Sequence, residues 1–283
     1  MTSQAKTFLL MLILSVLAVV MGAALGGRAG LMLALGFAVL MNFGSYWFSD
    51  RIVLGIYKAR EVGPYDAPML HRIVEELAQK AGIPKPKVYI VPQEAPNAFA
   101  TGRNPEHAAV AVTDGILKIL TPDELKGVLA HEIGHVAHRD TLVQTVVAVM
   151  ASLVTSLAYM LRWSAVAGRD NRMGAIGGLL LALLAPLAAI LIQMGISRSR
   201  EYMADDIGAQ LSGSPHSLAT ALAKLGAYSK QIPMQAREST AHMFIVNPLT
   251  SQSLASLFST HPPIEERIAR LEKMQESFRN SSQ

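Results

Sequence analysis

Hydrophobic positions along this chain gather in four long runs that contain no charged residue. The runs cover 8–25, 30–48, 141–161 and 173–197. Each is close to the ~20 residues that a helix needs to cross a bilayer. Backbone groups in lipid must pair within the segment itself, which favours helices. The pattern therefore predicts four membrane-spanning helices.

Each pair of runs has an alternative interpretation. The first run could be a cleaved signal peptide with Lys6 at its basic start. Only "GGRAG" separates the first run from the second, which favours a membrane hairpin over 1–49. For 141–197 the alternative is a buried helical core, because Pro186 interrupts the last run and both runs flank a candidate active site.

The basic residues predict which side of the membrane the chain faces. Arg28 alone lies between the first two runs, whereas Arg51, Lys58 and Arg60 follow the second. By the positive-inside tendency, both termini and the polar parts of the chain face the cytoplasm. Three arginines in the loop 162–172 conflict with an outside position for that loop.

The polar remainder forms two blocks, 50–140 and 198–283. In the first, 66–80 has helical periodicity, and 87–91 and 108–113 have the composition of strands. The second block is helical in pattern. Ser214 is placed as the N-cap of a helix that begins at Pro215, and a charged helix is predicted within 260–278.

These elements predict a mostly α-helical membrane protein. Four apolar helices accompany an α+β domain that is split around the third and fourth helices. The expected divisions are an N-terminal hairpin (1–49), a first domain part (50–140), a second apolar pair (141–197) and a second domain part (198–283).

Composition agrees with a membrane protein. Hydrophobic residues make up 51% of the 283 residues, and charged residues make up 16%. Soluble domains have about 25% charged residues. The chain has no cysteine, which excludes disulfides, thiolate metal sites and thiol catalysis. The net charge of +4 is modest, and no basic cluster is interleaved with aromatic residues, so we expect no nucleic-acid partner.

Candidate chemistry begins in a well-marked helix. Thr121 has the position of an N-cap, Pro122 is at the first helical position, and Glu124 completes a capping box. The helix continues through "ELKGVLAHEIGHVAHRD".

The pattern H-E-x-x-H lies on this helix. His131 and His135 are four residues apart, which places both imidazoles on one face where they can bind one ion. Zinc makes a bound water acidic, and Glu132 is close enough to take its proton. This is the arrangement of metallopeptidases. The alternative is two ordinary surface histidines.

Catalytic zinc needs a third protein ligand and an open position. The candidates are His138, Glu201 and His261. His138 is on the same face but ~10 Å along the helix axis, which favours a packing or hydrogen-bonding role. Glu201 and Asp205 are four apart, so Glu201 can ligate zinc while Asp205 holds a ligand histidine. The alternative is a solvated acidic face.

Four separated motifs together resemble the HtpX family of bacterial membrane zinc endopeptidases, which is related to the CAAX prenyl protease. They are "VLAHEIGHVAHRD", "SRSREYMADDIGA", "NAFATGR" and "LFSTHPPIEERIARL". The resemblance implies a gluzincin-like domain that binds one Zn²⁺ per chain through His131, His135 and Glu201. It also implies Glu132 as general base and Asp205 as a support.

Two further residues are candidates for substrate binding. "APNAFATGR" (95–103) resembles the gluzincin edge-strand motif, in which Asn97 would bond a substrate main chain. The alternative is a plain turn before a strand. His261 could donate to the developing oxyanion, or it could make a structural hydrogen bond at a helix start.

The resulting hypothesis is a multi-pass zinc endopeptidase of the bacterial inner membrane. The resemblance implies quality control and stress response, with misfolded or damaged membrane proteins and unfolded polypeptides as substrates. One rival is a processing peptidase for lipidated or membrane-anchored substrates. Another is a non-catalytic multi-pass protein with structural zinc, which predicts a closed four-ligand site. Glu132 argues against it, because a structural site needs no base.

Overall fold

The structure is a computed structural model that describes residues 3–152, 198–232, 234, 236–237, 239–248 and 262–281. The fourth apolar run, the end of the third, the loop 162–172 and His261 lie outside these residues.

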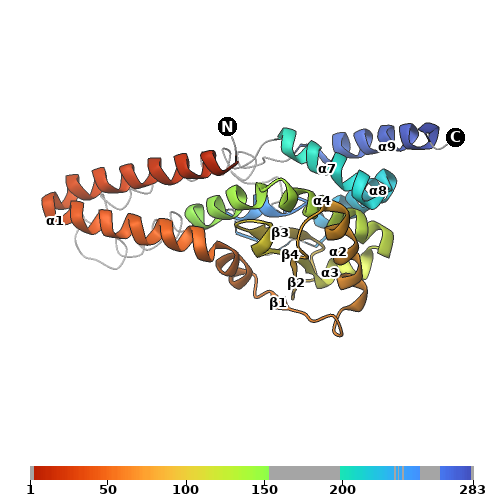
Figure 1. The fold of residues 1–283 in the computed structure, drawn as a ribbon, viewed down its shortest axis with the longest axis horizontal. Coiled ribbons are helices and arrows are strands. Elements are labelled where there is room, and N and C mark those ends of the chain that lie inside the picture. The colour runs from red at the N-terminus through yellow and green to blue at the C-terminus, as the bar shows by residue number, and fades with distance from the viewer. Residues whose placement is uncertain are drawn as a thin grey trace.

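The N-terminal apolar runs form a helical hairpin. Helix α1 (Ser3–Ile56) is interrupted at Gly27, whose φ of 55° and ψ of −138° are not helical. Glycine adopts a positive φ without the steric cost that a side chain brings. A Cβ at Gly30 would collide with the carbonyl of Gly22, so the two arms touch near the turn. Figure 1 shows them side by side, extending away from the rest of the protein.

The hairpin contains the helix that is able to cross a membrane. Among the described residues, Gly26–Ile56 is the one helix long and apolar enough to cross a bilayer, and Met11–Val20 is a shorter apolar stretch. Large apolar side chains are exposed along both arms; they include Phe8, Leu12, Val20, Met32, Leu33 and Leu40. An apolar surface of this kind suits contact with lipid or protein rather than with water.

A four-stranded sheet has the order β1-β2-β4-β3. The strands are β1 (Arg60–Glu61), β2 (Lys87–Val91), β3 (Ala98–Gly102) and β4 (Ala108–Thr113). Strand β2 is parallel to β4, and β3 is antiparallel to β4. The predicted strands 87–91 and 108–113 are present, and the strand in "APNAFATGR" is at the edge of the sheet.

The helices around the sheet are α2 (Pro68–Ala81), α3 (Asp114–Ile119), α4 (Pro122–Ala137), α7 (Arg198–Ser212), α8 (Pro215–Ser229) and α9 (Ile264–Ser281), with short 3-10 turns at Pro105–His107 and Ala241–Met243. The capping box of α4 is confirmed, since Thr121 and Glu124 bond each other's backbone N–H groups. Ser214 caps α8 as predicted.

One hydrophobic core joins segments from both polar blocks. It contains buried residues of α2, β2, β3, β4 and α4, together with residues of α7, α8 and α9 and the pair Ile245 and Val246. Helix α4 lies at the centre and contacts α2, α7, α8 and β3. The helix that carries H-E-x-x-H is thus held on several sides.

The described part of the third apolar run is a buried helix, Asp140–Ser152. Leu142, Val146 and Met150 pack against Met11 of the hairpin. Ala148 and Val149 join a second cluster with Phe99 of β3 and other residues. This part of the run matches the alternative of a buried core helix.

Candidate metal centre

Helices α4 and α7 approach closely at a glycine. A Cβ at Gly208 would lie 2.9 Å from the backbone nitrogen of His131 and 3.0 Å from its Cα. Gly134 of α4 lies beside Ala204 of α7 in the same contact. Small residues at the crossing bring the α7 backbone near the histidines, which lets Glu201 reach them.

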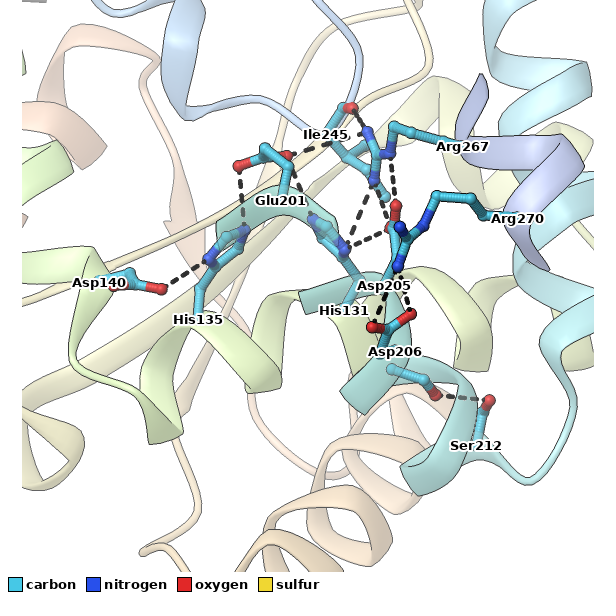
Figure 2. A network of polar contacts seen from close by, with 11 residues as sticks. His131, His135, Asp140, Glu201, Asp205, Asp206, Ser212, Ile245, Arg267 and Arg270 are labelled. Atoms are coloured by element: carbon cyan, nitrogen blue, oxygen red, sulfur yellow. Dashed lines mark hydrogen bonds and ion pairs between the residues drawn. The ribbon is translucent and has the colours of Figure 1, made fainter. Parts of the chain in front are cut away.

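His131, His135 and Glu201 form a compact group of buried ligand atoms that all lie within 4.8 Å of one another. The carboxylate of Glu201 is 3.4 Å from Nε2 of His135 and 3.8 Å from Nε2 of His131. The two imidazole rings are nearly perpendicular, with centroids 4.8 Å apart. Figure 2 shows both rings and the carboxylate converging on one point.

Glu132 faces the edge strand. Its carboxylate accepts a hydrogen bond from the backbone N–H of Ala100 in β3. Burial, aided by the charge of Glu201, raises the pKa of Glu132 to about 7. A carboxylate with a pKa near neutral can both accept and donate a proton at physiological pH.

The two histidines differ in charge. Burial lowers the pKa of His131 to about 4, so its imidazole is neutral. Burial acts in the same direction on His135, but bonds to Asp140 and Glu201 outweigh it and raise the pKa to about 10. A metal ion must therefore displace a proton from His135 but not from His131.

Behind His131 lies a buried ion pair. Nδ1 of His131 is 2.9 Å from Oδ1 of Asp205. Arg267 of α9 binds both oxygens of that carboxylate, at 2.7 and 2.9 Å, and donates to the carbonyl of Ile245. Although burial raises the pKa of Asp205, Arg267 and His131 together hold it below its usual value. The carboxylate is thus ionised.

A similar pair lies behind His135. Nδ1 of His135 is 3.5 Å from Oδ2 of Asp140, and Arg200 is 3.1 Å from Oδ1 of the same carboxylate. Arg139 adopts a positive φ of 58°. A non-glycine residue with a positive φ turns the chain sharply. This turn separates α4 from the next helix and brings Asp140 beneath His135.

The predicted substrate residue Asn97 has internal partners. Its side-chain amide donates to the carbonyl of Val246 at 2.8 Å, and its oxygen accepts from the backbone N–H of Ala98. The N–H of Ile245 donates to the carbonyl of Ala98. Part of the free edge of β3 is thus paired with residues 245–246. Contact of Asn97 with a substrate stays a prediction.

A shallow pocket lies against the site. Besides the three candidate ligands and Glu132, it is lined by Gln144, His242, Met243, Phe244 and Ile245. His242 bonds the carbonyl of Gln144. His138 bonds the carbonyl of Gly134, the nearby hydrogen-bonding role expected of it, and it is not part of the ligand group.

Sequence reasoning missed two residues near the site, Asp140 and Arg267, and gave Arg200 no part in supporting a ligand. Arg267 had a readable signal, because it lies three residues after Ile264, on the stripe that continues with Ile268 and Leu271. A charged residue on an apolar stripe indicates a buried ion pair. For Asp140 and Arg200 the spacing gave no such signal.

Comparison with known proteins agrees with this geometry. Residues 64–275 match peptidase family M48. A protein described as "Protease HtpX homolog" from Desulfatibacillum aliphaticivorans is 56% identical over 277 residues, which cover 96% of this chain and 89% of that protein. Another with the same description, from Pyrococcus furiosus, is 55% identical over 274 residues, covering 95% of each.

The fold also has a solved counterpart. The crystal structure of S. mikatae Ste24p superposes with a TM-score of 0.51 at 22% identity, over 92% of this chain. This chain spans 62% of the length of that protein, and the likeness concerns the fold alone.

The family match and the similar proteases define a metalloprotease. The chain belongs to peptidase family M48, among the proteases of the HtpX type.

Proposed function

We propose that the protein is a membrane-integrated zinc endopeptidase in which His131, His135 and Glu201 hold one Zn²⁺ and Glu132 is the general base. The observation that carries the proposal is the convergence of three buried ligand atoms beside a buried carboxylate. Membership of a metalloprotease family supports it.

The donor set fits zinc. Two imidazole nitrogens and one carboxylate oxygen are zinc ligands, and three protein ligands with an open position are typical of catalytic sites. Bonds of about 2.0–2.1 Å in tetrahedral geometry place ligand atoms about 3.3 Å apart. Glu201 lies 3.4 Å from His135 through one oxygen and 3.8 Å from His131 through the other, and single ligand atoms of the three residues lie within 4.8 Å of one another, so the side chains must draw closer to bind one ion.

The metal, Glu132 and the edge strand have different roles in the proposed hydrolysis. Zinc in such a site supplies Lewis acidity, which makes water a nucleophile at neutral pH. Glu132 accepts a proton from the attacking water and donates it to the nitrogen of the leaving amine. Ala100 orients Glu132 through its N–H, and it lies on the edge strand, where the part of the edge not paired with residues 245–246 can bond an extended peptide.

The hairpin supports a site at a membrane. Its exposed apolar arms extend from the peptidase core and favour insertion into a bilayer, with the site near the membrane surface. The resemblance to the HtpX family supports misfolded or damaged membrane proteins and unfolded polypeptides as substrates in the bacterial inner membrane, and the positions of the basic residues support cleavage at its cytoplasmic side.

The testing experiment uses the full chain purified in detergent and an unfolded model protein. We expect cleavage by the wild type with zinc, and none after removal of the metal. Glu132→Gln should bind zinc at one per chain and cleave about 10²- to 10⁴-fold more slowly. Glu75→Gln, an exposed glutamate of α2, is the control and should keep full activity.

The outcomes separate the rival functions. Cleavage of a lipidated peptide but not of an unfolded protein would indicate a processing peptidase. Bound zinc with no cleavage of either substrate would indicate a structural metal. Cleavage by Glu132→Gln at the wild-type rate would refute the assigned base.

A further inference from the structure

We propose that Arg267 and Arg200 are positioning residues, each of which holds the carboxylate behind one of the two histidines. Asp140 then joins Asp205 in supporting the metal centre. The inference rests on the proposed function, because it takes His131 and His135 as zinc ligands.

The support behind His131 is the tighter one. Asp205 lies 2.9 Å from Nδ1 of His131, and Arg267 binds both of its oxygens. A guanidinium that binds both oxygens of a carboxylate fixes its orientation as well as its charge. The side chain of Arg267 is 1% exposed, and its third nitrogen, Nη1, donates to the carbonyl of Ile245. This array leaves Asp205 little freedom to rotate.

Behind His135 the same groups follow in the same order, a histidine, a carboxylate and an arginine. The distances between them are longer than behind His131. Asp140 lies 3.5 Å from Nδ1 of His135 and 3.1 Å from Arg200. The side chain of Asp140 is buried, and that of Arg200 is 14% exposed. We therefore expect this second support to contribute less to metal binding than the first.

Arginine is suited to this position for a physical reason. A guanidinium presents its N–H groups in a fixed planar arrangement that matches the two oxygens of a carboxylate, so it can hold that carboxylate in one orientation. A carboxylate held in this way accepts from Nδ1 of the histidine and fixes both the orientation of the ring and the nitrogen left free for the metal.

Helix α7 links the two supports. It carries the third candidate ligand, Glu201, and the preceding residue Arg200 reaches Asp140 on one side. Four residues after Glu201, Asp205 reaches His131 on the other side. Figure 2 shows Asp140 and Asp205 on opposite sides of the histidine pair. Movement of α7 would disturb one ligand and both supports at once.

The test measures zinc affinity of the full chain in detergent by competition with a fluorescent chelator. We expect Arg267→Met to weaken zinc binding about 10- to 100-fold, as loss of an outer partner of a ligand does elsewhere. Asp140→Asn and Arg200→Met should weaken it less, about tenfold at most. Arg267→Lys keeps the positive charge but cannot bind both carboxylate oxygens in the same way. It should therefore recover part of the lost zinc affinity.

Arg270→Met is the matched control. Arg270 pairs with Asp206 at 3.3 Å between the same two helices, but both side chains are exposed to solvent. The Arg270→Met variant should bind zinc as tightly as the wild type does. A similar loss in Arg270→Met and Arg267→Met would overturn the inference, because helix contact alone would then explain the effect.

Arg267→Met leaves Asp205 buried without its cation and is at risk of misfolding. The double variant Arg267→Met/Asp205→Asn removes both charges and should fold, as shown by thermal unfolding, while its zinc affinity stays weakened. Wild-type affinity in the folded double variant and in Asp140→Asn would overturn the inference and leave the proposed function intact. A wild type that binds no zinc would overturn the proposed function itself.

Discussion

Arg267 and Asp205 form an ion pair with two bonds, of 2.7 and 2.9 Å, in the interior of the protein. The pair joins α9, close to the C-terminus, to α7, and through Asp205 it reaches His131 of α4. Buried ion pairs contribute little net stability, because desolvation offsets their attraction. The pair therefore serves to fix one arrangement of the three helices around the candidate metal site.

The closeness of α4 and α7 gives a first prediction. The methyl added by Gly208→Ala would lie 2.9 Å from the backbone of His131 and force the helices apart. The substitution should therefore lower the stability of the protein by about 1–3 kcal/mol. Thermal unfolding of the metal-free protein measures this loss. Gly44→Ala is the control: open space surrounds that position of α1, so no loss is expected.

The N-cap of α4 gives a second prediction. In Thr121→Ala the N–H of Glu124 loses its acceptor at the start of the helix. The loss should cost about 1 kcal/mol of stability. Thr121→Ser keeps the acceptor and should stay near the wild type. Urea unfolding checks both variants. Equal stability of the alanine and serine variants would show that the cap contributes nothing.

Local signals explain why much of the fold could be predicted from the sequence. The capping box at Thr121 and the strands 87–91 and 108–113 depend on residues next to one another in the chain, and each appears where it was expected. The candidate ligand group could be predicted partly for the same reason. His131 and His135 share a helix face by spacing, and Glu201 was a candidate from its spacing to Asp205 before the motif resemblance selected it.

Contacts between residues far apart in the chain could not be predicted from the sequence. Nothing near Asn97 in the sequence indicates that residues 245–246 pair with it. Hydropathy alone also could not separate the exposed arms of α1 from the buried helix Asp140–Ser152, because lipid and a protein core select the same side chains. Whether an apolar helix faces lipid is decided by what packs on it.

The protonation of His135 gives a third prediction. Its pKa of about 10 means that the metal-free protein carries a proton there at pH 8, whereas His131, with a pKa of about 4, does not. Zinc binding must release that proton. The apparent Kd for zinc should therefore fall about tenfold per pH unit between about pH 7 and pH 10.

Calorimetry in buffers of different ionisation enthalpy counts the proton directly. We expect at least one proton released per zinc at pH 8, the proton of His135, with a further contribution where the zinc-bound water also ionises. Zinc binding without proton release at pH 8 would contradict the assigned charge of His135.

The internal bonds of Asn97 give a last prediction, which separates a structural role from a substrate role. In Asn97→Ala the buried carbonyl of Val246 loses its donor. Stability should then fall by about 1–3 kcal/mol, the cost of leaving a buried polar group unpaired. The control is Asn104→Ala, since the side chain of Asn104 bonds the exposed ring of His107. A surface substitution of this kind should change stability by about 0.5 kcal/mol or less.

Thermal unfolding and the KM for an unfolded substrate are measured together on both variants. A higher KM at unchanged stability would assign Asn97 to the substrate main chain. Lost stability with an unchanged KM would instead make Asn97 the residue that fastens residues 245–246 to the edge strand, because the broken bond to Val246 would then account for the whole effect.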